Sequence, residues 1–188
     1  MAAEPRPPAG VAPEPVIEWH PVPWPHGPAQ QSAAGRHAAA AALSSAGSAE
    51  RTVPRDPHGR PCFPRGFPGS ISHTAHLAVA VVVPGAEAVG ADIESAAVTA
   101  RMAAFVLGER ERRTLLPPAG EYSPRELFAA KEAAYKAMNG AGTPGEFLFW
   151  RIGLSRSGGT LTASYRGVRV PLWIHSEAGH AFAVAIRR

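Results

Sequence analysis

Cysteine is almost absent from this chain, since Cys62 is the only one among 188 residues. A single thiol excludes an intrachain disulfide, so the fold has to be stable without covalent cross-links. At this length a chain can bury enough apolar surface to do so, as one substantial domain or as two small lobes. The scarcity of cysteine suits a reducing compartment, and we expect a cytoplasmic protein.

Long apolar runs are also missing. The longest, LAVAVVV at residues 77–83, is far too short for a membrane-spanning helix, which needs about 20 residues. The first residues, MAAEPRPPAGVAPEP, are rich in proline and lack the apolar core of a secretory signal. The sequence therefore predicts neither a membrane span nor secretion.

Lysine is scarce, so nearly all of the 19 basic residues are arginines. They outnumber 15 acidic residues and give a formal net charge of +4. The planar guanidinium suits phosphate, and this balance favours an anionic partner. Dense basic runs with interleaved aromatic residues are missing, which argues against nucleic acid as that partner.

Proline and glycine suggest how the chain is organised. Residues 1–30 hold much of the proline and are predicted to be an extended, partly ordered lead-in. We assign residues 31–95 to an N-terminal lobe and residues 96–188 to a C-terminal lobe. The first lobe is predicted to contain a helix from Gln31, an irregular loop, and a hairpin whose two strands end at Val83 and Ile93.

The second lobe is predicted to begin with two helices. The segment VTARMAAFVLGERERRTLL is amphipathic, with an interruption at Gly108. The next helix, SPRELFAAKEAAYKAMNG, starts with Ser123 and Glu126 at the spacing of a capping box. Four strands follow, in FLFWRIGLS, GTLTASYRG, VRVPLWIHSEA and HAFAVAIRR. HAFAVAI echoes the earlier HLAVAVV, as a duplicated half-domain would.

Two carboxylates in VGADIES are candidates for metal binding. Asp92 and Glu94 are two residues apart, so in a strand they share one face while Ile93 points into the core. Two acids held so close repel each other unless a cation lies between them, and a hard divalent ion such as Mg²⁺ meets that need. Taken alone, the segment fits a solvated strand end better, since paired acids are common there.

The predicted helix ELFAAKEAAYKAMNG carries matching residues. Glu132 and Lys136 are four residues apart and therefore neighbours on one face. As a surface ion pair they would contribute only a few tenths of a kcal/mol. In a site, Glu132 can complete the coordination begun by the two strand acids, while Lys136 reaches phosphate oxygens on the same metal.

His73, in SISHTAH, is predicted to lie where the chain enters the first strand of the hairpin. A single histidine is more often a hydrogen-bonded structural residue. The preceding loop, however, holds several arginines that would attract an anion to it. They are Arg51, Arg55, Arg60 and Arg65.

In this order, GSISHT, VGADIES and FAAKEAAYK resemble the three signature motifs of the Sfp-type and enterobactin-type 4′-phosphopantetheinyl transferases. These enzymes move phosphopantetheine from coenzyme A onto a carrier-protein serine. AAGRHAAAAAL resembles the upstream helix of the family. The resemblance implies an α+β fold with two pseudo-symmetric α/β lobes, antiparallel sheets and an active site in the cleft between them. It also implies a monomer.

The resemblance further implies roles for individual residues. Asp92, Glu94 and Glu132 would hold Mg²⁺, which bridges the pyrophosphate of coenzyme A. Lys136 would stabilise the charge that develops in transfer, and Glu132, or a water that it orients, would be the base. The residues that bind the cofactor would be Arg36, Arg55, Arg60, Ser72, His73 and Lys136.

The implied reaction is Mg²⁺-dependent transfer to a serine of an apo acyl or peptidyl carrier protein, with release of 3′,5′-ADP. Siderophore, polyketide or nonribosomal-peptide assembly would use such carriers. The alternative is a non-catalytic paralogue that binds coenzyme A or a carrier without transfer. The chain departs from the family just before Arg36, where AQQSA stands in place of the usual basic residues.

Overall fold

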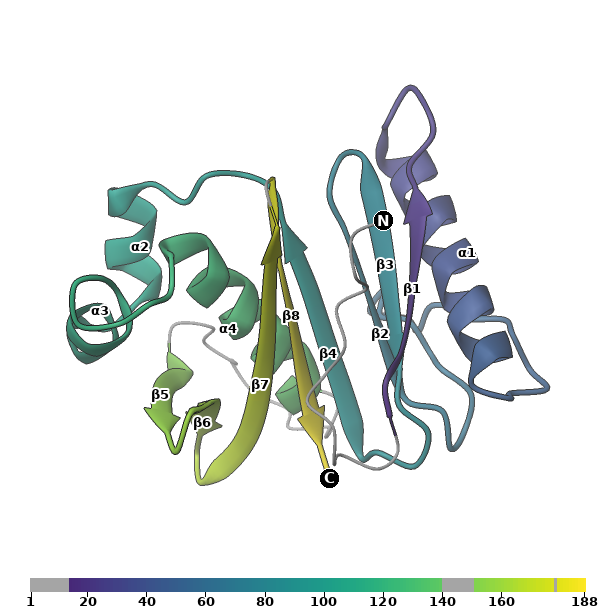
Figure 1. Cartoon of the computed structure of the whole chain (residues 1–188). Helices are drawn as coiled ribbons and strands as arrows, with labels where there is room; N and C mark the ends of the chain where they lie inside the picture. Colours follow the sequence, from purple (N-terminus) through teal and green to yellow (C-terminus); the bar gives the residue numbers. More distant parts are fainter. Residues whose placement is uncertain (1–13, 140–150, 178) are drawn as a thin grey trace.

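The computed structural model describes residues 14–139, 151–177 and 179–188. They form one three-stranded and one five-stranded antiparallel sheet, with helices on the outer faces of both (Figure 1). The predicted α+β class with antiparallel sheets is confirmed. None of the helices in these ranges is both long and apolar enough to cross a membrane.

The first sheet has the order β1-β3-β2 and carries helix α1. These elements are β1 (Val16–Pro21), α1 (Pro28–Ser45), β2 (Gly69–His73) and β3 (Leu77–Val82). α1 begins with a proline at a position where the missing N–H costs nothing. Its small side chains allow it to pack closely on β3, where they bury Ala38, Ala39, Ala42, Leu43, Ala80 and Val82.

The structure adds one strand to this half and shows that the predicted hairpin is wrong. β1 is a strand within the predicted lead-in, of which residues 1–13 lie outside the described part of the chain. Among the described strands it pairs with β3 alone, and an edge position tolerates its terminal proline. The strands that end near Val83 and Ile93 do not form the predicted hairpin, because β3 pairs with β1 and β2 while β4 (Ala88–Glu94) joins the other sheet. His73 accordingly ends β2 and does not lead into β3.

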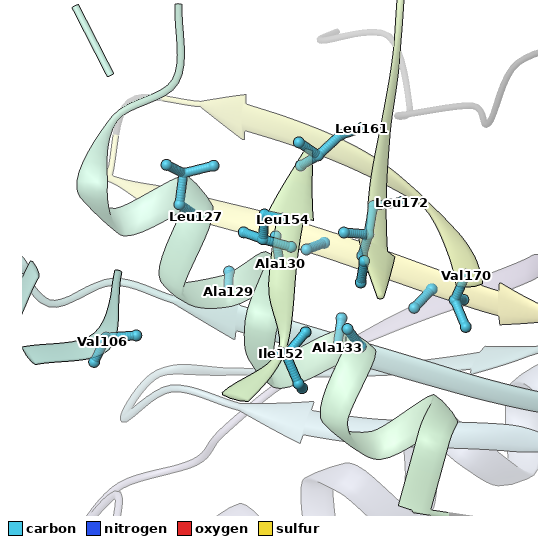
Figure 2. Close-up of a cluster of buried hydrophobic side chains, with 14 of the residues drawn as sticks. Val106, Leu127, Ala129, Ala130, Ala133, Ile152, Leu154, Leu161, Val170 and Leu172 are labelled. Atoms are coloured by element: carbon cyan, nitrogen blue, oxygen red, sulfur yellow. The ribbon is translucent and has the colours of Figure 1, made fainter. Parts of the chain in front are cut away.

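The second sheet has the order β4-β8-β7-β6-β5. Its later strands are β5 (Gly153–Ser157), β6 (Thr160–Tyr165), β7 (Val168–Glu177) and β8 (His180–Arg187). The predicted strand residues 147–150 lie outside the described part of the chain. Helix α4 (Pro124–Asn139) packs on one face of this sheet, where Leu127 and several alanines of the helix meet leucines of β5, β6 and β7 (Figure 2).

Two short helices precede α4. They are α2 (Ala100–Val106) and α3 (Glu109–Leu115), which are separated at Gly108 as predicted. They lie beside α4 at the outer end of the second half (Figure 1).

The two sheets pack against each other through a third apolar layer. It contains Val79, Val81, Val83, Val89, Ala91, Ile93, Phe182 and Val184. Strand alternation explains why β3 contributes to two apolar layers. Its side chains Ala80 and Val82 point toward α1, whereas the alternating valines at 79 and 81 point toward the second sheet. The layers therefore run from α1 through the two sheets to α4 (Figure 1).

The strand order of the first sheet recurs in the second. In each half the first strand pairs with the last, and the strand before the last flanks it, as β1-β3-β2 and as β4-β8-β7. The echoing sequences HLAVAVV and HAFAVAI fall on β3 and β8, the equivalent inner strands. This repetition supports pseudo-symmetric halves. The sheets divide between β3 and β4, earlier in the chain than the predicted lobe boundary after residue 95.

Candidate active site

Helix α4 begins with an N-terminal cap and lies close to a glycine of β4. The Ser123 backbone N–H donates to Glu126 Oε2 (2.6 Å), and the Glu126 N–H donates to Ser123 Oγ (3.3 Å), which is the predicted capping box. A Cβ at Gly90 of β4 would collide with the Ala133 carbonyl oxygen and would lie 2.6 Å from the Ala137 amide nitrogen. Only glycine allows this approach, which brings the polar turn of α4 next to the strand acids.

Asp92 is the centre of a hydrogen-bond network that joins both sheets and α4. Lys136 Nζ donates to Asp92 Oδ1 at 2.6 Å, and the Ser72 hydroxyl donates to the same oxygen at 2.8 Å. Lys136 also donates to the Ala91 carbonyl (2.9 Å) and to Ser72 Oγ (3.3 Å). Lys136, which was predicted to contact phosphate, thus contacts Asp92 in this structure.

Glu94 and Glu132 complete the acidic cluster around Asp92. Burial, together with the charges of Asp92 and Glu132, raises the pKa of Glu94 to about 7, against the opposing effect of Lys136. Burial and Asp92 likewise raise the pKa of Glu132. Ile93, between the two strand acids, is buried in the layer between the sheets, as predicted. The three carboxylates are therefore close enough to repel one another.

The cluster fits a divalent cation by residue type and by one unpartnered atom. Asp92 Oδ2 is buried and has no hydrogen-bond partner in the described part of the chain. Mutual repulsion among three carboxylates is the electrostatic condition that Mg²⁺ relieves. Within the described ranges, no group of three or more His, Cys, Asp or Glu side chains is placed so that it could hold a metal ion as it stands. The acids form an electrostatic cluster, not a finished coordination shell.

A cavity of about 180 Å³ lies on the other side of β2 and is lined by basic side chains. Arg36 of α1 and Arg55 of the following loop both donate to Ser32 Oγ, at 2.7 and 3.1 Å. His73 lines the same cavity, and desolvation together with the charges of Lys136 and Arg55 lowers its pKa. Two guanidinium groups and an imidazole around one small cavity suit a phosphate group. Gln31 and Ser32 line it where the family usually has basic residues.

A larger cavity, of about 760 Å³, adjoins the first along Pro61 and Ile71. Arg60 lines it from the loop before β2, and Tyr135 and Lys136 line it from α4. Arg60 is held in place by Asp56, since its Nε donates to Asp56 Oδ2 at 2.7 Å. The two cavities together run from the arginine cluster to Lys136, which pairs with Asp92 of the acidic cluster.

Sequence reasoning missed two features of this arrangement. Ser72 was assigned to the phosphate side, yet strand alternation turns it toward Asp92 while His73 faces the arginines. Lys131 was given no role, although it is fully buried and pairs with Glu111. A signal for this pair existed, because Lys131 follows Leu127 by four residues and so falls on the apolar stripe of α4.

Comparison with known proteins agrees with the motifs. Residues 29–83 match the model of the 4′-phosphopantetheinyl transferase N-terminal domain, and residues 88–186 match that of the 4′-phosphopantetheinyl transferase superfamily. The chain belongs to the 4′-phosphopantetheinyl transferase superfamily. The break between the two matches coincides with the division of the sheets between β3 and β4.

One curated member of the superfamily is similar over part of its length. It is the 4′-phosphopantetheinyl transferase PptT of Mycobacterium tuberculosis, which is 35% identical over 107 residues. The aligned region covers 54% of this chain and 47% of that relative. The match therefore spans about half the length of the relative.

Proposed function

We propose that this chain transfers the 4′-phosphopantetheine arm of coenzyme A to a serine of an apo acyl or peptidyl carrier protein, with release of 3′,5′-ADP. One observation carries the proposal: Lys136 pairs with Asp92, whose charge also acts on Glu132, and Lys136 lines the larger cavity, which adjoins the smaller cavity of Arg36 and Arg55. Membership of the superfamily and the similarity to PptT support it further.

The arginine-lined cavity would hold the phosphate on the nucleotide end of coenzyme A. Arg36, Arg55 and His73 supply hydrogen-bond donors there, and Arg60 would contact the nucleotide from the adjoining cavity. Binding that end firmly would leave the pyrophosphate next to the acidic cluster. Positioning of this kind can supply much of the rate enhancement in phosphoryl transfer.

Asp92, Glu94 and Glu132 would hold Mg²⁺ at the pyrophosphate. When bound, the ion would neutralise charge on the phosphate oxygens. Asp92 Oδ2, which has no hydrogen-bond partner among the described residues, supports this assignment. Lys136, already beside Asp92, would stabilise the charge that develops on the leaving group.

Glu132 would take the proton of the carrier serine, directly or through a water. The serine oxygen forms a bond to the β-phosphorus, and the bond from that phosphorus to the bridging oxygen breaks. The bridging oxygen leaves with 3′,5′-ADP. Burial and the Asp92 charge raise the pKa of Glu132, which makes its carboxylate a better proton acceptor near neutral pH.

The test is intact-protein mass spectrometry of an apo carrier protein incubated with the chain, coenzyme A and Mg²⁺. We expect a mass gain of one phosphopantetheine arm. Glu132→Gln should slow the transfer by about 10²–10⁴-fold, the usual range for a general base. Glu121→Gln, on an exposed acid that pairs with Arg156, is the matched control and should leave the rate unchanged.

Different outcomes separate the two readings. Binding of coenzyme A without any mass gain, over acyl and peptidyl carriers alike, would refute the transferase and favour the non-catalytic paralogue. Carriers from siderophore, polyketide and nonribosomal-peptide assembly are the proposed partners, and the same assay ranks them. The proposal includes a single chain as the functional unit, which light scattering on the purified protein tests.

A further inference from the structure

The two oxygens of the Asp92 carboxylate have very different surroundings. Oδ1 accepts two hydrogen bonds, from Lys136 Nζ at 2.6 Å and from Ser72 Oγ at 2.8 Å. Oδ2 is buried and accepts none within the described part of the chain. A carboxylate gripped by one oxygen alone presents the other in a fixed direction.

Ser72 is well placed to hold Asp92 Oδ1 by a hydrogen bond. It is 8% exposed and lies on β2, in the sheet opposite to Asp92, so its hydroxyl bridges the two halves of the molecule. Lys136 Nζ and the Ile93 N–H both approach Ser72 Oγ as donors, at 3.3 and 3.4 Å. With donors on its acceptor side, the hydroxyl has its own proton free for Asp92 Oδ1.

Strand geometry separates Ser72 from the phosphate side of the site. His73, the next residue, lines the cavity with Arg36 and Arg55, whereas Ser72 does not line it. Alternation along β2 therefore sends the two residues of the Ser-His pair to different parts of the site.

We propose that Ser72 is a positioning residue that orients Asp92 so that Oδ2 faces the divalent cation, and that it is not a ligand of coenzyme A. This inference rests on the metal site of the proposed function. Hydrogen-bond partners of metal-ligating carboxylates fix the orientation of the ligand, and their loss typically weakens metal affinity by about 10–100-fold.

The first test measures binding of Mn²⁺, as a paramagnetic substitute for Mg²⁺, to the full chain by electron paramagnetic resonance. Ser72→Ala should raise the Kd for Mn²⁺ by about 10–100-fold, and Ser72→Thr, which keeps the hydroxyl, should stay within about threefold of the unaltered chain. Ser48→Ala is the matched control, because Ser48 is similarly buried (5% exposed) and its hydroxyl donates to the Glu50 carbonyl and not to Asp92. Its Kd for Mn²⁺ should not change.

The second test measures binding of coenzyme A by calorimetry in the presence of a chelator. Ser72→Ala should leave this Kd within about twofold, whereas His73→Ala should weaken it about tenfold or more, as loss of a charge-assisted phosphate contact does. In the transfer assay, Ser72→Ala should need more Mg²⁺ for half-maximal rate but approach the unaltered rate at saturation. A purely structural role of Ser72 would not raise the Mg²⁺ requirement while leaving the Kd for coenzyme A unchanged.

The results separate this inference from the proposed function. An unchanged Mn²⁺ affinity in Ser72→Ala, or a loss of coenzyme A affinity without metal, overturns the role of Ser72 while transfer by the unaltered chain stands. Failure of Ser72→Thr to restore Mn²⁺ binding at unchanged thermal stability also overturns it. An unaltered chain that binds no Mn²⁺, even with coenzyme A present, overturns both.

Discussion

Replacement of Lys131 by methionine should destabilise the fold far more than the loss of an ordinary surface charge. Lys131 is fully buried, and its Nζ donates to Glu111 Oε2 and to the Val106 carbonyl, both at 2.8 Å. Glu111 is also buried and accepts backbone N–H groups of Gly108 and Leu154, both at 2.6 Å. The pair thus fastens α4 to the α2–α3 corner and to β5.

The magnitude follows from what Lys131→Met leaves behind. Methionine fills a similar volume, so little cavity cost is expected, but the carboxylate of Glu111 stays buried without its cation. Removal of one partner of a buried ion pair costs about 3–5 kcal/mol. A domain of ordinary stability has about 5–15 kcal/mol in total, so the variant should lose a large share of it. Glu111 keeps its two backbone donors, which places the expected loss nearer 3 than 5 kcal/mol.

Urea denaturation followed by far-ultraviolet circular dichroism measures this loss as a lower midpoint at an unchanged slope. The matched control is Arg113→Met on α3, which removes an exposed pair with Glu109, both side chains being 71% exposed. That change should cost less than about 0.5 kcal/mol. A loss of less than about 1 kcal/mol in Lys131→Met, or a loss no greater than that of Arg113→Met, would contradict a stabilising buried pair.

Three further predictions concern the site. Gly90→Ala should cost about 3 kcal/mol or more in the same urea assay, because its Cβ meets the α4 backbone at Ala133 and Ala137, which have little room to move. The pKa of Glu94 is about 7 in the folded protein, against an ordinary value of 4.5. Protonated Glu94 therefore contributes its whole stabilisation below pH 4.5, and this stabilisation is lost as the pH rises from 4.5 through 7. Glu94→Gln should therefore be more stable than the unaltered chain at pH 8 by about 1–2 kcal/mol, allowing for solvent screening, and equally stable at pH 4. Mg²⁺ should reduce the difference in stability at pH 8. A difference that does not depend on pH would contradict the raised pKa of Glu94. Arg55→Gln should weaken coenzyme A binding about tenfold or more and flatten its salt dependence in calorimetry, whereas an equal loss at all salt concentrations would argue against an ionic phosphate contact.

Local features of the sequence predicted the local parts of the structure. The capping box of Ser123 and Glu126 identified the start of α4, and the spacing of Asp92, Ile93 and Glu94 gave their faces on β4. Such features depend only on neighbours along the chain, whose spacing fixes their direction.

Strand pairing was not predictable in the same way. β3 and β4 are consecutive strands joined by a turn, which is the usual sign of a hairpin, yet they belong to different sheets. The partner of β4 is β8, whose residue Ala183 lies opposite Asp92 although it is far away in the sequence. β2 was not predicted because GSISH is short and polar. Without this strand, the direction in which the Ser72 side chain points could not be predicted. These errors arise because register and pairing depend on packing between distant segments.

The two lysines of α4 lead to a last prediction, in which stability and activity change in opposite order. Lys131 and Lys136 are five residues apart and so point about 140° apart around the helix, one into the helical corner and the other toward β4. Lys131 is buried, while the Lys136 side chain is 29% exposed and meets Asp92 beside the larger cavity.

Lys136→Met should therefore cost less folding free energy than Lys131→Met, because water can still reach the exposed side of the pair and a cation can replace the lost charge. Its transfer rate should fall more, since Lys136 alone of the two lies at the proposed pyrophosphate position. Urea midpoints and mass-spectrometric transfer rates of the two variants, measured with Mg²⁺ present, give the comparison. If one variant had both the lower stability and the lower transfer rate, the proposal that Lys131 stabilises the fold while Lys136 contacts phosphate would be wrong.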